Sequence, residues 1–334
     1  MPIEAQLLQA IDRVFEQRLT VPAVESFARS GSYLLRLCFT DRQLAEEFLP
    51  SFLHADAGRP DLQIGFLTGR EANLSAFVPH PPSEYRVIAG EDCFALWQPG
   101  DLPMLYLLNR KSGRALIWLP AGAAPDWIAS RPALPIMYAF SVDSPWIALH
   151  AAAVGLNDRI LLLAGEGRVG KTTAALACAR AGWTYAGDDY VYADTGSGKV
   201  EPLYCSARLR ADMTGAFPDL AEAATVISRS DGEARYELRL AGQLAPGQLR
   251  GGSLAAILLP RRRGAALPQF SPARRIDAVS ALYTSMTLTQ LGWPDVLINK
   301  AAMTVGLAPV FFVDTGQDPG AIPDAFAEFL GRLE

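Results

Sequence analysis

One eight-residue stretch, Gly165-Glu-Gly-Arg-Val-Gly-Lys-Thr172, limits what this chain can fold into more than any other. It fits the pattern G-x-x-x-x-G-K-[ST] at every fixed position, after an apolar run at Arg159–Ala164 and before a helical pattern over Lys171–Ala181. A strand that passes through such a loop into a helix is the phosphate-binding arrangement of P-loop proteins. The alternative, a chance glycine-rich turn, does not account for the strand and helix on either side.

The residues of this loop have separate physical roles. Glycines permit backbone conformations that a Cβ forbids, so that backbone N–H groups can converge on phosphate oxygens. Lys171 is predicted to reach the β- and γ-phosphates, and the Thr172 hydroxyl to serve Mg²⁺. The sequence therefore predicts ATP and Mg²⁺ as ligands, with the nucleotide held by Gly165, Gly167, Arg168, Val169, Gly170, Lys171, Thr172 and Thr173. The Thr173 hydroxyl has two interpretations, a phosphate contact or a helix cap.

A second acidic element is expected because P-loop enzymes use a carboxylate beside the Mg²⁺ ion. The apolar run Ser253–Leu259 is followed by Pro260 and three arginines, so it supplies none. The short run Trp183–Ala186 instead leads into Gly187 and two adjacent aspartates, Asp188 and Asp189. Neighbouring side chains on an extended segment point in opposite directions, so one carboxylate could face the metal and the other an acceptor hydroxyl. The alternative is a solvated Gly-Asp-Asp turn without chemistry.

Three features in this order resemble the catalytic domain of the HPr kinase/phosphorylase family. They are Leu149-His150, the glycine-rich loop, and Ala186-Gly187-Asp188-Asp189, and their spacing matches the family pattern as well. The resemblance covers about residues 145–195. It implies a P-loop kinase core related to that of ATP-dependent phosphoenolpyruvate carboxykinase.

The resemblance also implies roles for individual residues. Lys171 and Thr172 would serve phosphate and Mg²⁺, Asp188 would be the general base for a serine hydroxyl, and Asp189 would help to hold the metal. His150 would assist near Asp188, which makes Asp188, His150 and Lys171 the expected catalytic residues and Thr172 and Asp189 the expected metal ligands. For His150 the alternative is a packed histidine at a strand end.

The function implied is an ATP-dependent kinase that phosphorylates a serine of a peptide or protein. The family's second signature, an acidic-isoleucine-arginine-glycine stretch, has no counterpart after the double aspartate. This favours the HPr-kinase-related proteins of biosynthetic clusters, some of which phosphorylate ribosomal peptide precursors, including lasso-peptide precursors. Two alternatives remain open: a small-molecule hydroxyl kinase, and a non-catalytic ATP-binding sensor or assembly module. Family members often form oligomers, so the resemblance leaves a homo-oligomer open.

Two domains are expected from the length of 334 residues. Residues 1–130 are predicted to form a smaller α+β domain, with a helix at Ile3–Leu19 and a strand at Tyr33–Phe39, and hypothetically to recognise the acceptor. An antiparallel meander is predicted between residues 62 and 120, and its Tyr85, Trp97, Tyr106 and Trp118 are candidates for either a peptide surface or the core. Residues 131–334 are predicted to form the α/β catalytic domain, with a helix that starts at Ser271-Pro272.

Net charge, cysteine content and the length of apolar runs exclude several classes of binding partner and site. A net charge of -5 argues against a general nucleic-acid binder, which needs a basic surface. The four cysteines form no CxxC pair, which argues against a zinc site and favours a reduced, cytoplasmic protein. No apolar run reaches the roughly 20 residues of a membrane span.

Arg208 and Arg210 are two candidates for stabilising a transferring phosphoryl group, and the sequence does not choose between them.

Overall fold

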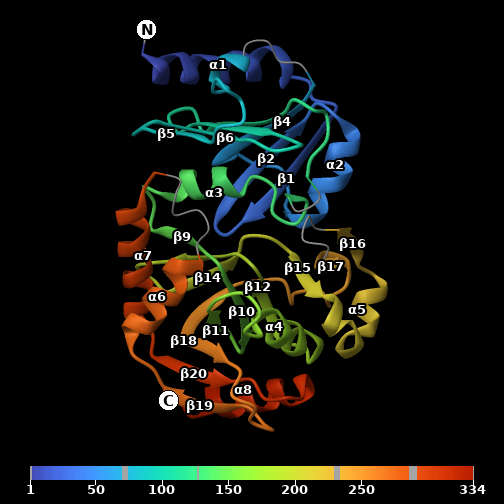
Figure 1. Cartoon of the computed structure of the whole chain (residues 1–334), viewed down its shortest axis with the longest axis vertical. Coiled ribbons are helices and arrows are strands. Elements are labelled where there is room, and N and C mark those ends of the chain that lie inside the picture. The colour runs from blue at the N-terminus through green and yellow to red at the C-terminus, as the bar shows by residue number, and fades with distance from the viewer. Residues whose placement is uncertain (1, 70–73, 126–127, 229–233, 286–291, 334) are drawn as a thin grey trace. The chain divides into compact units, whose positions relative to one another are not determined.

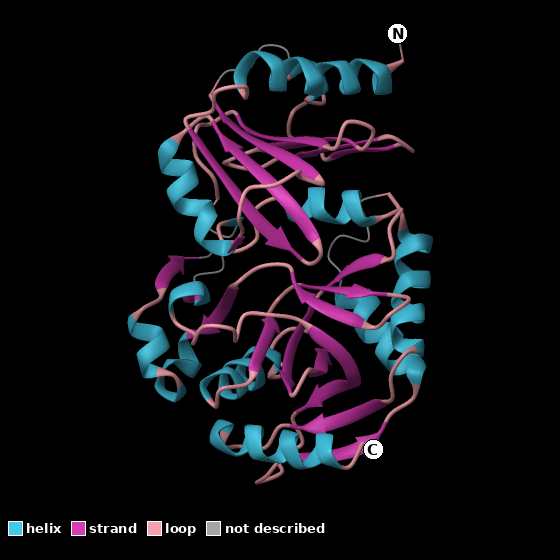
Figure 2. Cartoon of the chain, turned by 180° about the vertical axis from the view of Figure 1, so that it is seen from behind, coloured by secondary structure: helices cyan, strands magenta, loops and turns pink. Residues whose placement is uncertain are grey.

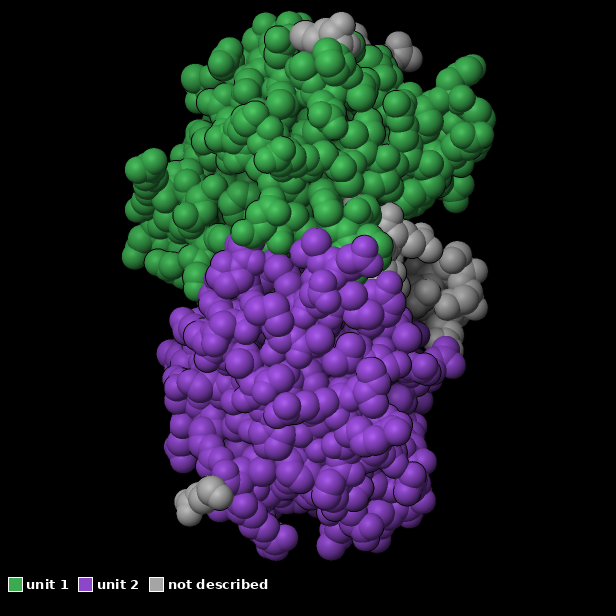
Figure 3. Space-filling model, turned by 90° about the vertical axis from the view of Figure 1, so that its left-hand side faces the viewer, with its two compact units in different colours: residues 1–143, 288–294 green, residues 144–287, 295–334 purple. Residues whose placement is uncertain are grey.

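The computed structural model describes residues 2–69, 74–125, 128–228, 234–285 and 292–333. The chain divides into two compact units, residues 1–143 with 288–294 and residues 144–287 with 295–334 (Figure 3). Both units mix helices with β-sheet, which agrees with the predicted α/β class (Figure 2). None of the described helices has both the length and the apolar character needed to cross a lipid bilayer.

The first unit contains an eight-stranded sheet in the order β3-β1-β2-β4-β8-β7-β6-β5 (Figure 1). Its strands are β1 Val24–Ser30, β2 Tyr33–Phe39, β3 Leu53–His54, β4 Leu62–Thr68, β5 Arg86–Ala89, β6 Cys93–Gln98, β7 Met104–Asn109 and β8 Arg114–Leu119. Its helices are α1 Ile3–Arg18, α2 Arg42–Phe48 and α3 Leu134–Ser141. The predicted meander is correct for β5 to β8, which pair antiparallel. It is wrong for β4, which pairs parallel with both β2 and β8.

Helix α1 covers one face of this sheet because its apolar residues recur at helical spacing. Leu7, Ile11, Val14 and Phe15 are buried against strand residues that include Trp97 and Trp118. These two tryptophans and Tyr106 are at most 5% exposed, so they belong to the core, whereas Tyr85 is 52% exposed. The core alternative is therefore correct for three of the four candidate aromatic residues.

The second unit contains a nine-stranded sheet and a three-stranded sheet. The strands of the larger sheet are β9 Trp146–Leu149, β10 Ala151–Leu156, β11 Arg159–Ala164, β12 Thr184–Gly187, β13 Val191–Asp194, β14 Lys199–Pro202, β18 Gly252–Arg261, β19 Gln269–Pro272 and β20 Val310–Asp314. The smaller sheet is formed by β15 Ser206–Arg210, β16 Thr225–Ser228 and β17 Ala234–Arg239. The helices are α4 Lys171–Arg180, α5 Pro218–Glu222, α6 Arg275–Ser285, α7 Pro294–Gly306 and α8 Ile322–Gly331, and Pro294 itself belongs to the first unit.

His150 connects strands from opposite sides of the larger sheet. Its main path runs β12-β10-β11-β18-β14-β13-β9, so β9 and β10 lie near opposite ends of that path. Yet only His150 separates Leu149, the last residue of β9, from Ala151, the first of β10. The connection from β12 to β13, through Asp188, Asp189 and Tyr190, spans the same junction. These two crossings bring His150 beside the double aspartate.

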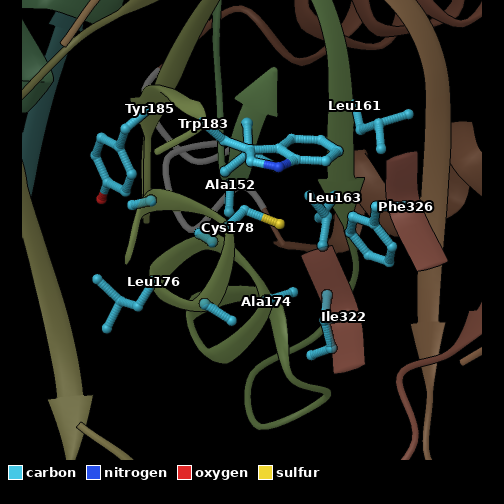
Figure 4. Close-up of a cluster of buried hydrophobic side chains, with 14 of the residues drawn as sticks. Ala152, Leu161, Leu163, Ala174, Leu176, Cys178, Trp183, Tyr185, Ile322 and Phe326 are labelled. Carbon is cyan, nitrogen blue, oxygen red and sulfur yellow. The ribbon is translucent and has the colours of Figure 1, made fainter. Parts of the chain in front are cut away.

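The core of the second unit lies between the sheet and helices α4 and α8 (Figure 4). Buried side chains of β10 and β11, such as Ala152 and Leu163, meet Ala174 and Cys178 of α4 and Phe326 of α8. Each large apolar side chain buried here contributes about 1.5–3 kcal/mol. This packing fixes α4 against the strand that precedes the glycine-rich loop.

The predicted helix start at Ser271-Pro272 is wrong. Ser271 and Pro272 were expected to begin a helix, but they belong to β19, which pairs with β20. Helix α6 begins later, at Arg275, and is described as far as Ser285. In the first unit, Asp41 caps α2 by accepting a bond from the Leu44 N–H at 3.0 Å. That helix gives way to a 3₁₀ turn at Leu49–Ser51, which contains Pro50.

Candidate nucleotide-binding site

The glycine-rich loop lies at the carboxyl ends of three parallel strands. β11 pairs parallel with β18, and β18 pairs parallel with β20. A Cβ built on Gly165 would lie 3.9 Å from Pro260 near the end of β18, and one on Gly170 would lie 3.4 Å from the Thr315 hydroxyl oxygen beyond β20. In open α/β sheets, ligands bind outside the carboxyl ends of the strands. The loop occupies that place.

The loop backbone takes conformations that favour glycine. Gly165 has φ +153° and Gly170 has φ +108°, and Arg168 between them is also left-handed at φ +73°. Gly170 is the residue before α4, and the first N–H groups of a helix have no partner within the helix. Such N–H groups, with the helix dipole, favour an anion. The structure thus presents a helix N-terminus behind a strained loop, a suitable site for phosphate.

Lys171 is the buried cation of this loop. It is 7% exposed, and its Nζ donates to the carbonyl oxygens of Gly165 at 2.6 Å and Glu166 at 2.9 Å. Burial lowers its pKa, while the charges of Asp188 and Asp189 act in the opposite direction. The Lys171 side chain therefore folds back onto the loop, near enough to the two aspartates for their charges to act on it.

Asp188 is the more buried of the two aspartates. It is 3% exposed, its carboxylate accepts a hydrogen bond from the Thr172 hydroxyl, and its Oδ2 is buried with no hydrogen-bond partner among the described residues. Burial raises its pKa to about 6, the Asp189 charge adds to this, and Thr172 and Lys171 oppose it. A buried carboxylate oxygen without a donor is costly unless a cation or proton satisfies it.

Asp189 has a different environment. Its side chain is 30% exposed, its Oδ1 lies 3.1 Å from His150 Nε2, and its Oδ2 lies 3.7 Å from Arg208 Nη1. An ionised carboxylate only accepts hydrogen bonds, so Nε2 carries the hydrogen in that pair. His150 also contacts the Tyr190 ring at a centroid distance of 5.2 Å. The resemblance places His150 near Asp188, and the structure gives it a contact with the next residue, Asp189.

The two aspartates belong to a tight turn of the backbone. Gly187 has φ +142°, and a Cβ there would lie 2.7 Å from Val191 Cγ1. Asp189 is left-handed at φ +69°, and the Tyr190 N–H donates to the Asp188 carbonyl at 2.8 Å. A non-glycine residue in this region costs of order 1–3 kcal/mol and is often found at functional sites. The sequence predicts an extended segment here, but the backbone turns at Asp189.

The residues around Thr172 fit a Mg²⁺ ion bound together with a nucleotide. Mg²⁺ is usually held by one or two protein groups plus phosphates and water, rather than by a cage of protein ligands. Within the described ranges, no group of three His, Cys, Asp or Glu residues could hold a metal alone. The Thr172 hydroxyl and the unsatisfied Asp188 oxygen are instead the two oxygen donors that such a site needs.

Arg208 and Arg210, the two arginines considered for stabilising a phosphoryl group, have different partners in the structure. Arg208 lies beside Asp189, whereas Arg210 donates to Asp212 from Nε at 2.9 Å and Nη2 at 3.2 Å. Arg261 lies over the Phe312 ring and so belongs to the packing of the sheet edge. Sequence reasoning did not find Thr315, which borders the loop because β20 ends there. Strand pairing rather than a motif places it.

No model of a known protein family matches the chain, and neither does any curated protein sequence. Among solved structures, the HPr(Ser) kinase/phosphatase from Coxiella burnetii is similar over 56% of this chain and 94% of that chain, with 11% sequence identity and a TM-score of 0.26. A likeness at that TM-score carries no functional assignment.

Proposed function

We propose that the chain is an ATP-dependent kinase that transfers the γ-phosphoryl group to a serine hydroxyl of a peptide or protein. The observation that supports this most is the hydrogen bond from Thr172, at the first turn of α4, to the buried Asp188. It joins the glycine-rich loop to the acidic turn, so that phosphate-binding, metal-binding and proton-accepting groups share one site. Phosphoryl transfer needs these groups and little else from the protein.

The residues have distinct tasks in this proposal. The loop from Gly165 to Gly170 and the first N–H groups of α4 hold the phosphates, and Lys171 contributes its positive charge to them. Mg²⁺, when bound, neutralises charge on the β- and γ-phosphates. One aspartate serves the metal and the other orients the acceptor hydroxyl and accepts its proton. The resemblance would make Asp188 the base and Asp189 the metal ligand.

The acceptor is proposed to be the serine of a ribosomal peptide precursor, of the lasso type for example, and residues 1–130 are proposed to recognise it. The proposal rests on the sequence resemblance and on the need of a P-loop kinase for a second surface that binds the acceptor. A chain that lacks residues 1–120 should keep ATP binding and lose acceptor phosphorylation. Full acceptor phosphorylation by the shortened chain would contradict this role.

The test of the function is transfer of label from γ-labelled ATP with Mg²⁺. Candidate acceptors include a peptide precursor encoded beside the gene, and the Asp188→Asn and Asp189→Asn variants are the controls. Label on a serine that is lost in both variants supports the kinase. If a metabolite hydroxyl is labelled without any peptide, the chain is a small-molecule kinase. If ATP binds and no acceptor is labelled, it is an ATP-binding sensor or assembly module.

A further inference from the structure

We propose that residues 261–275 form a basic docking surface for an acidic segment of the acceptor polypeptide. That the ligand is an acceptor rests on the proposed kinase function. The surface adds a contact in the second unit to the recognition proposed for residues 1–130. None of its residues belongs to the glycine-rich loop or to the acidic turn.

The stretch concentrates positive charge in a chain that is acidic as a whole. It holds five arginines and no aspartate or glutamate among its 15 residues, whereas the 334-residue chain has 30 Lys and Arg against 35 Asp and Glu. The arginines form two groups, 261–263 at the end of β18 and 274–275 at the start of α6. The first group directly follows Pro260, which borders the glycine-rich loop. A surface of one sign attracts a partner of the opposite sign.

Most of these charges are open to solvent and are not neutralised locally. Four of the arginines are exposed, namely Arg262, Arg263, Arg274 and Arg275. Arg274 is paired with Asp277 at 2.7 Å. The guanidinium groups of the other three form no ion pair within the part of the chain that the structure describes. The Asp314 carboxylate accepts hydrogen bonds from the backbone N–H groups of Arg263 and Ala265, so it holds the turn itself.

Like charges are crowded at the end of β18. Arg261 lies over the Phe312 ring. Burial lowers the pKa of Arg261 and the charge of Arg263 lowers it further, while Asp277 acts in the opposite direction. Carboxylates of a bound segment would relieve this repulsion between neighbouring guanidinium groups.

Strand β19 sets the distance between the two groups of arginines. It pairs with β20 alone among the described strands, and Asp314, which holds the Arg263 N–H, lies opposite its first residue, Gln269 (Figure 1). The four residues of β19 cover roughly 13 Å, so an extended segment of about five residues is long enough to reach from Arg263 to Arg274. A single phosphate group cannot contact both groups, which favours an extended acidic polypeptide over the nucleotide as the ligand.

A chain of contacts connects this surface to the acidic turn. Arg208 lies 3.7 Å from Asp189, and Arg210 follows two positions later, roughly 6–7 Å along β15. The hydrogen bond from Arg210 lowers the pKa of Asp212 most, and the charge of Arg262 lowers it further. Arg262 therefore lies close to the end of β15. Acidic residues within about ten positions of the serine can reach it while the serine hydroxyl is at the acidic turn.

The first experiment measures peptide binding to the full chain by fluorescence anisotropy, with a non-hydrolysable ATP analogue and Mg²⁺ present. One labelled peptide has a serine and several glutamates within about ten residues of it, and the matched peptide has glutamines in their place. The glutamate peptide should bind about tenfold or more tightly at low salt, and this preference should shrink as salt is added. The double variant Arg262→Gln/Arg263→Gln should weaken its binding about three- to tenfold.

Arg250→Gln is the matched control. Its side chain is 51% exposed and lies just before β18, at the opposite end of that strand from Arg262. This variant should bind the glutamate peptide as the unaltered protein does. Equal affinity for the two peptides, or an equal loss in Arg250→Gln and in the double variant, would overturn the docking surface.

Two further outcomes would give the arginines another ligand and would also overturn the proposal. If the double variant loses affinity for the ATP analogue by the same factor as for the peptide, the arginines belong to the nucleotide site. If a single-stranded DNA of equal charge displaces the glutamate peptide at a lower concentration than the unlabelled peptide does, the surface binds nucleic acid.

The second experiment measures the kinetics of phosphorylation of the glutamate peptide. The double variant should raise the KM for this peptide about three- to tenfold, with kcat and the KM for ATP unchanged, because docking precedes transfer. A lower kcat with an unchanged KM for the peptide would contradict a docking role. Binding is measured without transfer, so a chain that binds the glutamate peptide and phosphorylates no acceptor counts against the kinase proposal alone.

Discussion

At the scale of single residues, the glycine-rich loop depends on Gly170 more than on Gly167. Gly170 has φ +108°, and a Cβ there would lie 3.4 Å from the Thr315 hydroxyl oxygen, whereas a Cβ on Gly167 would meet open space. We expect Gly170→Ala to lower the free energy of unfolding by about 1–2 kcal/mol, and Gly167→Ala to change it by less than about 0.5 kcal/mol. Urea denaturation of both variants measures this difference. If both variants lose the same free energy of unfolding, the left-handed backbone at Gly170 is not the reason that the loop needs glycine there.

A second residue-scale prediction follows from the burial of Asp188, which raises its pKa to about 6 from 3.8. Between these two pH values the folded protein binds the proton that the unfolded chain releases, so folding becomes less favourable as the pH rises through this window. Above pH 6 the buried charge costs about 3 kcal/mol. Without divalent ions, Asp188→Asn should therefore be more stable than the unaltered protein at pH 8.

The advantage of Asp188→Asn should shrink below pH 6 and be small near pH 4, since the native carboxyl is then protonated. Urea denaturation at pH 8 and pH 5, in the presence of a chelator, would measure it. Asp189→Asn is the matched control, because it removes a charge from a more exposed carboxylate of the same turn. A stabilisation by Asp188→Asn that is the same at both pH values would contradict the assigned cause.

The motif identified the loop residues, but it could not identify their partners. Gly165 to Thr172 could be named from the pattern alone because the chemistry requires those residue types at that spacing. The contact of His150 with Asp189 could not, because it depends on a left-handed residue inside a turn that sequence reasoning takes for extended backbone. Likewise, the choice of Arg208 over Arg210 depends on the register of β15 against β17.

At the scale of elements, hydrophobic periodicity predicted the elements well and their ends less well. The helix at Ile3–Arg18 has apolar residues at the helical spacing of about 3.6 residues, and the strand at Tyr33–Phe39 has the alternation of a strand. Each pattern fits only one type of element. The parallel pairing of β4 with β2 and β8 could not be read from spacing, because parallel and antiparallel strands share the same alternation. Ser271-Pro272 has the residues of a helix start, yet pairing with β20 holds both in a strand.

The start of α2 gives a prediction at this scale. Asp41 accepts a hydrogen bond from the Leu44 N–H at 3.0 Å, which satisfies one of the free donors of the first turn. We expect Asp41→Ala to destabilise the first unit by about 1 kcal/mol and Asp41→Asn by only a few tenths. Thermal unfolding of the two variants tests this. If alanine and asparagine cost the same, charge at the helix end matters rather than the hydrogen bond.

At the scale of the whole molecule, the two units have separate cores. One buried cluster joins α1 to its sheet around Leu107, and another joins α4 and α8 to theirs around Leu163. The candidate nucleotide site lies entirely within the second unit, because its loop, its acidic turn, His150 and Arg208 all belong to residues 144–287. The binding energy of a nucleotide is therefore expected to stabilise the second unit directly.

This arrangement predicts two calorimetric transitions, of which one responds to nucleotide. A non-hydrolysable ATP analogue with Mg²⁺, at about 100 times its Kd, should stabilise the second unit by about 2.7 kcal/mol and raise its unfolding temperature. Leu107→Ala, in the core of the first unit, should lower the other transition, since such a substitution costs about 2–5 kcal/mol. Leu163→Ala is the matched variant, and it should lower the transition that responds to nucleotide. A single transition that moves as a whole in all three experiments would mean that the two cores unfold together, and nucleotide binding would then stabilise the entire chain.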